Sequence, residues 1–175
     1  MTQDIKKIAI IGPECTGKSD LSTWLAEYFH TVWVPEYARG YLENLAHPYQ
    51  QSDLLSIAHG QLRLEDEWIR DANRFLFCDT NLYVIKVWSE FKYGSTDREI
   101  LETIAHRKYD LYLLTYVDIP WKEDPQREHP HQRQQLYEIY LREMQQQPVP
   151  FAEIRGDGDE RRRSAAAAVE KFLLT

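Results

Sequence analysis

The sequence contains only two cysteines, Cys15 and Cys78, and they lie far apart in the chain. That number and spacing fit neither a disulfide framework nor a cysteine-based zinc site. Basic residues are also scarce relative to acidic ones, with 21 Lys and Arg against 28 Asp and Glu and a formal net charge of −7. Because nucleic-acid binding depends on neutralising phosphates with Lys and Arg, we expect no nucleic-acid partner.

Long apolar runs are missing as well. No run approaches the roughly 18 apolar residues of a membrane span, so we expect no membrane partner. The segment Met1–Lys7 lacks the apolar core of a signal peptide, which favours the reducing cytoplasm as the location. Internal repeats and low-complexity linkers are also absent. With 175 residues, 43% of them apolar, the chain is expected to form a single domain over residues 1–175 with its own core.

Apolar residues instead cluster in five short runs, which are rich in β-branched and aromatic residues and mostly do not alternate with polar ones. The runs cover residues 8–11, 32–34, 75–78, 111–114 and 149–154. Such runs indicate strands that are covered on both faces, as in a parallel sheet. Because Pro150 cannot donate a ladder hydrogen bond, we place the fifth strand at a sheet edge or begin it after the proline.

Helical patterns separate these runs, with apolar residues three and four positions apart. The predicted helices span residues 18–29, 52–70, 82–91, 98–105, 132–144 and 161–174. Ser52 is expected to cap the second helix, with Asp53 as a competing cap. Strands that alternate with helices predict an α/β fold with a doubly wound parallel sheet.

The strongest motif is a glycine-rich loop between the first predicted strand and the first predicted helix. It matches the pattern G-x-x-x-x-G-K-[ST] with Gly12, Pro13, Glu14, Cys15, Thr16, Gly17, Lys18 and Ser19. In such a phosphate loop the glycines permit a tight turn that points backbone N–H groups at phosphate oxygens, beside the positive end of a helix dipole. Lys18 is expected to contact the β- and γ-phosphates, and Ser19 to ligate Mg²⁺. We expect residues 12–20, Asp20 included, to bind ATP.

The motif predicts that a nucleoside triphosphate binds, but it does not say how the triphosphate is used. The guanine-reading segment N/T-K-x-D of GTPases is absent, and a large mechanical ATPase usually has a longer chain. A small phosphotransferase fits the length best. The alternative is a regulatory or binding module that hydrolyses ATP slowly and changes a partner surface.

Asp79 ends the third predicted strand, at the edge where parallel α/β sheets bind ligands. A carboxylate in that position holds Mg²⁺ in phosphate-loop enzymes, which makes Asp79 a candidate metal and catalytic residue. The alternative is that Asp79 caps the helix that begins near Leu82. Thr80, the next residue, is a candidate contact to the acceptor substrate.

A second polar segment follows the second predicted strand. Glu36 can accept the proton of an attacking hydroxyl or bind a ribose, and Arg39 can pair with a phosphate or with Glu36. The alternative is an ordinary helix start with an acidic first turn. Tyr37 and Trp88 each follow a strand and can stack on a substrate base, although core packing is the simpler role for Trp88.

Residues 118–131, here called the lid segment, form a long polar loop that contains three prolines. Loops of that length in compact domains often close over an active site. A guanidinium suits a transferring phosphate, so Arg127 is the candidate lid arginine and Arg133 the second choice. His129 and His131 are expected to be exposed.

A glycine-rich loop joins the fifth predicted strand to the last predicted helix. Its residues Gly156, Asp157 and Arg161 either border the adenine of ATP or belong to an ordinary turn. The basic triplet Arg161–Arg163 is too short for a nucleic-acid patch and is expected to be a solvated helix face.

Six segments, in this order, carry a family resemblance: IAIIGPECTGKSDLSTWLA, VPEYAR, FLFCDTN, KYDLYLLTYVDIPWKEDPQRE, QRQQLYEIYL and FAEIRGDGDERRRSAAAAVEKFL. With them the chain resembles the nicotinamide riboside kinase domain of bifunctional NadR proteins, in the AAA-domain P-loop family. The resemblance implies a five-stranded parallel sheet of P-loop nucleotide-kinase type with a lid. It also implies ATP and Mg²⁺ as cofactors, and phosphoryl transfer to the ribose 5′-hydroxyl of nicotinamide riboside. The product would be nicotinamide mononucleotide, in NAD salvage.

The resemblance also assigns roles to the candidate residues. It assigns Lys18 and Ser19 to the triphosphate and the metal, and Asp79 to the metal or the acceptor hydroxyl. It assigns Glu36 and Arg39 to the acceptor side and Arg127 to the lid. Of the four expected catalytic residues, Lys18, Glu36, Asp79 and Arg127, two compete for the role of general base, namely Glu36 and Asp79. A kinase of another nucleoside is the alternative activity, and assembly into a homo-oligomer stays open.

Overall fold

The structure, a computed structural model, describes residues 4–173. Its sheet has five parallel strands, arranged in the order β2-β3-β1-β4-β5. The strands are β1 (Lys6–Ile11), β2 (Val32–Val34), β3 (Phe75–Asp79), β4 (Leu111–Thr115) and β5 (Phe151–Ile154). Both expectations for the fifth strand are met, because β5 lies at the sheet edge and begins directly after Pro150. The predicted doubly wound parallel fold is therefore confirmed.

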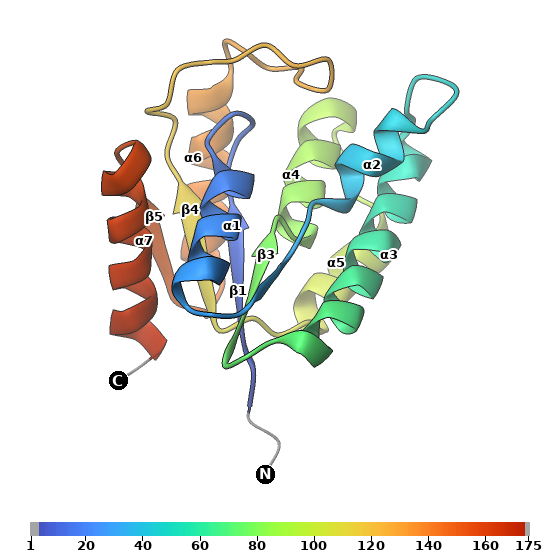
Figure 1. The fold of residues 1–175 in the computed structure, drawn as a ribbon. Coiled ribbons are helices and arrows are strands. Elements are labelled where there is room, and N and C mark those ends of the chain that lie inside the picture. The colour runs from blue at the N-terminus through green and yellow to red at the C-terminus, as the bar shows by residue number, and fades with distance from the viewer. Residues whose placement is uncertain (1–3, 174–175) are drawn as a thin grey trace.

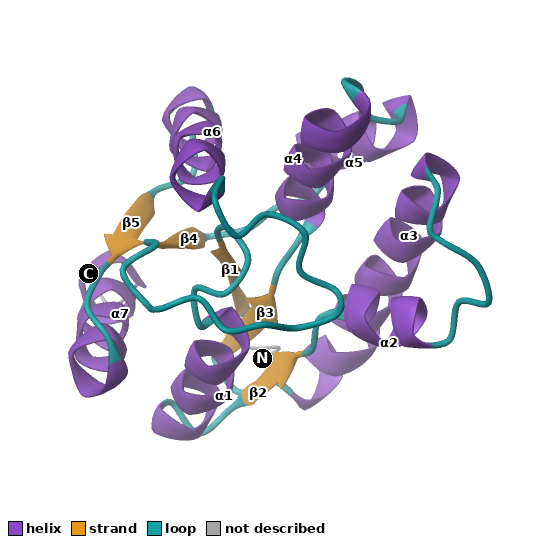
Figure 2. Ribbon diagram, turned by 90° about the horizontal axis from the view of Figure 1, so that it is seen from above, coloured by secondary structure: helices purple, strands orange, loops and turns teal. Residues whose placement is uncertain are grey.

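Helices cover both faces of the sheet (Figure 1). They are α1 (Lys18–Tyr28), α2 (Tyr37–Glu43), α3 (Gln51–Trp68), α4 (Leu82–Tyr93), α5 (Arg98–His106), α6 (Arg133–Gln146) and α7 (Gly158–Leu173), with a short 3-10 turn η1 (Ile69–Asp71) after α3. Figure 2 shows α1 and α7 on one face and α4 and α6 on the other, with α2 and α3 beside β2. In the described range 4–173, no helix combines the length and the apolar character that crossing a bilayer would need.

The cap of α3 and the start of α7 differ from the predictions, and α7 begins at Gly158, three residues before its predicted start. Ser52 is not the cap of α3, because the helix begins at Gln51 and Gln50 occupies the cap position. The side chain of Asp53 accepts a hydrogen bond from the backbone N–H of Gln50 at 2.7 Å, which completes a reciprocal capping box. Helix α2, seven residues long, begins directly after Glu36, so this segment is a helix start, as the alternative expectation stated, but its first turn holds no acidic residue.

The core lies between the sheet and its two helical layers. Ile8 and Ile10 of β1 face the α1–α7 side, and Ala9 and Ile11 face the α4–α6 side. All four side chains are fully buried, as expected for a central parallel strand without polar alternation. A third apolar cluster joins α2, α3, α4 and α5 to one another beyond β2. This packing holds the carboxyl ends of β1, β3 and β4 together under one loop.

That loop is the lid segment, which connects β4 to α6. In Figure 1 it crosses above the carboxyl ends of the strands, and in the view of Figure 2 it runs over the start of α1 toward α2. Ligands in open α/β sheets bind at this end of the strands. The fold therefore places the phosphate loop, the end of β3 and the lid segment at one site.

Candidate nucleotide and acceptor site

The phosphate loop, residues 12–19, has the backbone shape that its glycines allow. Gly12 has φ 142° and Gly17 has φ 77°, both in the region that residues with a side chain avoid. A Cβ on Gly12 would lie 2.5 Å from Oγ1 of Thr115, so β4 leaves no room for a larger residue there. The Thr16 hydroxyl closes the turn by donating to the carbonyl of Pro13 at 2.8 Å. The close approach of β4 and this hydrogen bond together fix the shape of the loop.

Lys18 stands at the centre of the site. Its Nζ donates to the carbonyl of Pro13 at 2.7 Å, which holds the amine over the loop. Burial lowers the pKa of Lys18, and the carboxylates of Glu36, Asp79 and Glu14 oppose that shift. A triphosphate with its metal would therefore bind beside a buried cation, Lys18, that lies near three carboxylates.

Asp79 is almost fully buried and faces the start of α1. The hydroxyl of Ser19 donates to its Oδ2 at 2.5 Å, while its Oδ1 is buried without a hydrogen-bond partner. Burial and the nearby carboxylate of Glu36 raise the pKa of Asp79 to about 6. The alternative role as a helix cap is wrong, because Asn81 caps α4 by accepting from the N–H of Tyr83 at 3.0 Å.

The pair Ser19 and Asp79 fits the protein side of a Mg²⁺ site. Mg²⁺ is commonly held by one or two protein oxygens together with phosphates and water. An orphaned carboxylate oxygen beside a hydroxyl offers those oxygens. The described residues contain no group of three or more His, Cys, Asp or Glu able to hold a metal, so the remaining ligands would come from the nucleotide and water.

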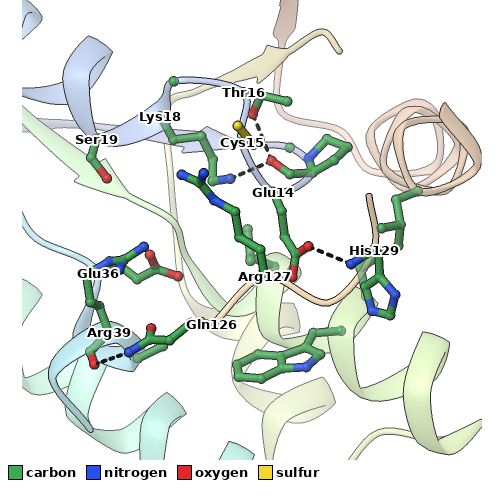
Figure 3. Close-up of a pocket in the computed structure, with 18 of the residues that line it drawn as sticks. Glu14, Cys15, Thr16, Lys18, Ser19, Glu36, Arg39, Gln126, Arg127 and His129 are labelled. Carbon is green, nitrogen blue, oxygen red and sulfur yellow. Dashed lines mark hydrogen bonds between the residues drawn. The ribbon is translucent and has the colours of Figure 1, made fainter. Parts of the chain in front are cut away.

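A cavity of about 320 Å³ opens next to the phosphate loop (Figure 3). It brings together the predicted residues Glu36, Arg39, Trp88 and Arg127 with the whole of residues 12–20. Figure 3 shows the Arg127 side chain rising from the lid segment toward Lys18. The apolar and aromatic lining residues, together called the apolar end here, are Ala38, Leu42, Val84, Val87, Trp88, Phe91, Leu136 and Tyr140. The cavity therefore combines the charged residues of the phosphate loop, α2 and the lid segment with an apolar, aromatic lining.

Several residues that line the cavity were not predicted from the sequence. Phe91 and Tyr140 looked like ordinary core positions on helices, and Gln126 had no distinguishing motif. His129 was expected to be exposed, but it lines the cavity and its ring packs edge-on against Phe91 at 4.9 Å between centroids. Its position two residues after Arg127 was the available signal, since both belong to the loop that covers the site.

Three of the residues predicted to contact the acceptor, Tyr37, Asp79 and Thr80, lie outside the cavity lining. The ring of Tyr37 packs against Gly60 of α3, where an added Cβ would lie 2.1 Å from a ring carbon. Thr80 is buried with φ 70°, and its N–H donates to the carbonyl of Ile10 at 3.0 Å. Tyr37 therefore anchors α2 to α3, and Thr80 turns the chain after β3.

Arg161 corrects the expectation of a solvated basic face. Its side chain is buried and donates to the carbonyls of Thr16 at 3.0 Å and Gly156 at 2.7 Å. It also donates to the carbonyl of Tyr116 at 3.1 Å and pairs with the carboxylate of Asp118. Arg161 thus holds the phosphate loop from behind, and it lies outside the cavity lining together with Gly156 and Asp157.

The lid segment is tied to the phosphate loop and to α2. The carboxylate of Glu14 accepts from the backbone N–H groups of Glu128 and His129 at 3.0 and 3.1 Å. Asp124 pairs with Arg39 of α2 at 3.1 Å. These contacts place the lid segment over the cavity in a closed position.

The Arg127 guanidinium donates to the carbonyl of Lys122 within the lid segment. The second candidate, Arg133, instead donates to the carbonyls of Cys15 at 3.0 Å and Ile119 at 2.9 Å. Arg127 is thus the arginine that reaches the cavity, while Arg133 supports the base of the lid segment and the phosphate loop.

The AAA domain family profile matches residues 7–161. The chain belongs to the AAA domain family. As a member of that family it is similar to the trifunctional NAD biosynthesis/regulator protein NadR of Salmonella typhimurium (strain LT2), with 28% identity over 126 residues. The NadR protein of Escherichia coli (strain K12) is 29% identical over the same length. Each match covers 69% of this chain and 30% of the curated relative, so this AAA domain corresponds to a part of those proteins.

Solved structures place the AAA domain among P-loop nucleotide kinases in fold. A crystal structure of NadR protein in complex with NR superposes with a TM-score of 0.80 and 22% identity, over 96% of this chain and 50% of that chain. Deoxyadenosine kinase from M. mycoides superposes with a TM-score of 0.65 and 13% identity, over 94% of this chain and 99% of that chain.

Proposed function

We propose that this AAA domain is an ATP-dependent kinase that phosphorylates the ribose 5′-hydroxyl of nicotinamide riboside. The observation that carries the proposal is the cavity itself, in which a phosphate loop and an apolar, aromatic end share one space under the lid segment. A phosphotransferase needs both substrates in one enclosed space so that the phosphoryl group can pass in line. The likeness to NadR proteins, one of them solved with NR, supports this acceptor.

The donor side follows from the phosphate loop. The backbone N–H groups of residues 13–19 would bind the phosphates of ATP, and Lys18 would exchange its bond to Pro13 for the β- and γ-oxygens. Ser19 and Asp79 would hold Mg²⁺, which neutralises charge on the phosphates when bound. Arg127, which lines the cavity, would stabilise the charge that spreads over the transferring phosphoryl group.

The acceptor side follows from the apolar end. A pyridinium ring is flat and cationic, so aromatic faces and nearby carboxylates suit it. Trp88, Phe91 and Tyr140 supply the aromatic walls, and Glu36 and Glu14 supply negative charge. Arg39, also in the lining, is placed to contact the growing phosphate ester.

Glu36 is the general base that the geometry favours. It lines the cavity, whereas Asp79 lies outside the cavity lining, is nearly fully buried and accepts from Ser19 through Oδ2. The 5′-hydroxyl oxygen attacks the γ-phosphorus, the bond from that phosphorus to the β–γ bridging oxygen breaks, and the hydroxyl proton passes to Glu36. Closure of the lid segment over this step excludes water and limits hydrolysis of ATP.

The test is an ADP-release screen of the purified chain with ATP, Mg²⁺ and either nicotinamide riboside or each common nucleoside. We expect ADP release that depends on nicotinamide riboside, and a Glu36→Gln variant that still binds ATP but turns over at least about 100-fold more slowly. ADP release that depends on another nucleoside would show that this nucleoside, and not nicotinamide riboside, is the acceptor. Slow ADP release that is the same with and without each nucleoside would favour the regulatory module instead.

A further inference from the structure

Beside Trp88, which lines the cavity, side chains from three separate segments meet at one hydroxyl. Tyr49 lies in the loop between α2 and α3 and presents its OH to α4 and to the lid segment. Trp88 Nε1 donates to this OH at 2.8 Å, and Lys92 Nζ donates to it at 2.5 Å. The OH in turn donates to a carboxylate oxygen of Glu128 at 2.6 Å. We call these four residues the Tyr49 cluster.

The hydroxyl of Tyr49 uses all of its bonding capacity in this cluster. A phenol has one hydrogen to donate and two lone pairs to accept with, and the three bonds use each of them. Burial and the bond to Glu128 raise the pKa of Tyr49 to about 12, so the phenol keeps its proton at neutral pH. Removing this oxygen atom would therefore break three contacts at once and leave the Glu128 carboxylate with its ion pair to Lys92 at 2.9 Å.

The cluster connects a fixed wall of the cavity to its cover. Trp88 lines the cavity, and its ring packs edge-on against Tyr49 at 4.9 Å. Because an indole has a single N–H, the bond to Tyr49 selects one orientation of the ring. On the other side, Glu128 stands between Arg127 and His129, and both neighbours line the cavity.

We propose that Tyr49 is a positioning residue that couples the lid segment to the aromatic wall of the acceptor end. With the lid segment down, Glu128 fixes the Tyr49 hydroxyl, and that hydroxyl fixes the Trp88 ring against which the acceptor base lies. With the lid segment open, the Trp88 ring loses this restraint. The acceptor role of Trp88 rests on the proposed function, whereas the connection between Tyr49 and the lid segment does not.

The first test needs no substrate. Trypsin cleaves after Lys122 and Arg127 once the lid segment opens, and mass spectrometry identifies the cut. We expect Tyr49→Phe to be cleaved there about five times faster than the unaltered chain. Tyr41→Phe is the matched control, because Tyr41 also donates to a carboxylate, Asp53 at 2.7 Å, but lies outside the cavity lining. Equal cleavage rates for the two variants would overturn the connection to the lid segment.

The second test measures how Tyr49→Phe acts on turnover. We expect the KM for the acceptor to rise about tenfold while the KM for ATP stays within twofold, because the phosphate loop is untouched. In a Trp88→Phe background the same change should add less than twofold, since Tyr49 then has no indole to orient. An equal rise in both KM values, or full additivity with Trp88→Phe, would refute the positioning role. If no nucleoside is turned over, the proposed function fails, and the trypsin comparison still decides the connection to the lid segment.

Discussion

Replacing Arg161 with methionine tests how strongly the last helix holds the phosphate loop. The substitution keeps an apolar stem but removes the guanidinium, which donates to three backbone carbonyls and to Asp118. The side chain is 4% exposed, so water cannot easily replace those bonds. The carbonyl of Thr16 would lose this partner, on a residue that is itself fully buried.

The magnitude follows from these contacts. An unpaired buried carbonyl costs about 1–3 kcal/mol. Asp118 is 27% exposed and regains water, which limits its share. We therefore expect Arg161→Met to lower the free energy of unfolding by about 3 kcal/mol. At roughly 2–4 °C per kcal/mol for a chain of this size, the melting temperature should fall by about 6–12 °C.

The assay is thermal unfolding followed by circular dichroism, with Arg163→Met as the matched control. Arg163 is an exposed neighbour on α7, so its replacement should shift the melting temperature by less than about 2 °C. Arg161→Met should also weaken ATP binding, because the loop that it supports binds the phosphates. If the two variants have the same melting temperature, the hydrogen bonds of Arg161 do not stabilise the fold and the reasoning is wrong.

Three further predictions concern the site. Lys18→Ala should abolish phosphoryl transfer and leave the circular dichroism spectrum unchanged, and full activity would contradict the proposed donor site. Arg127→Ala should lower kcat more than it changes the KM for ATP, whereas a change in KM alone would exclude its role in the transition state. Because the pKa of Asp79 is raised to about 6, the ligand-free chain should lose stability as the pH rises from about 4 to 7, by at most about 3 kcal/mol. Asp79→Asn should flatten that dependence in urea unfolding and remove activity, and an unchanged pH profile would refute the assignment.

The sequence predicts the features that depend on local spacing. The phosphate loop lies within eight consecutive residues, and the five apolar runs lie within one or two residues of the observed strands, so both can be found from the pattern alone. Asp79 could be predicted because parallel strands end at one edge, which places a residue at the end of β3 beside the phosphate loop. Helix α2 was harder to predict from the sequence, because seven residues carry too little periodicity.

The features that depend on distant partners could not be predicted. Arg161 stands in a run of three arginines that reads as exposed, and its burial depends on carbonyls supplied by the phosphate loop and by the chain after β4. Tyr37 turns away from the cavity because Gly60, on another helix, leaves space for its ring. Tyr49 had no motif at all, because its role comes from three partners brought together by the fold.

The bond between Arg161 and Thr16 also bears on the order in which the chain is made. The two residues are 145 positions apart, so the ribosome releases the phosphate loop long before the arginine that supports it. At roughly 5–20 residues per second, about 7–30 s separate them. During that interval the nascent chain carries its nucleotide motif without its support, and it gains a finished nucleotide site only when α7 has docked.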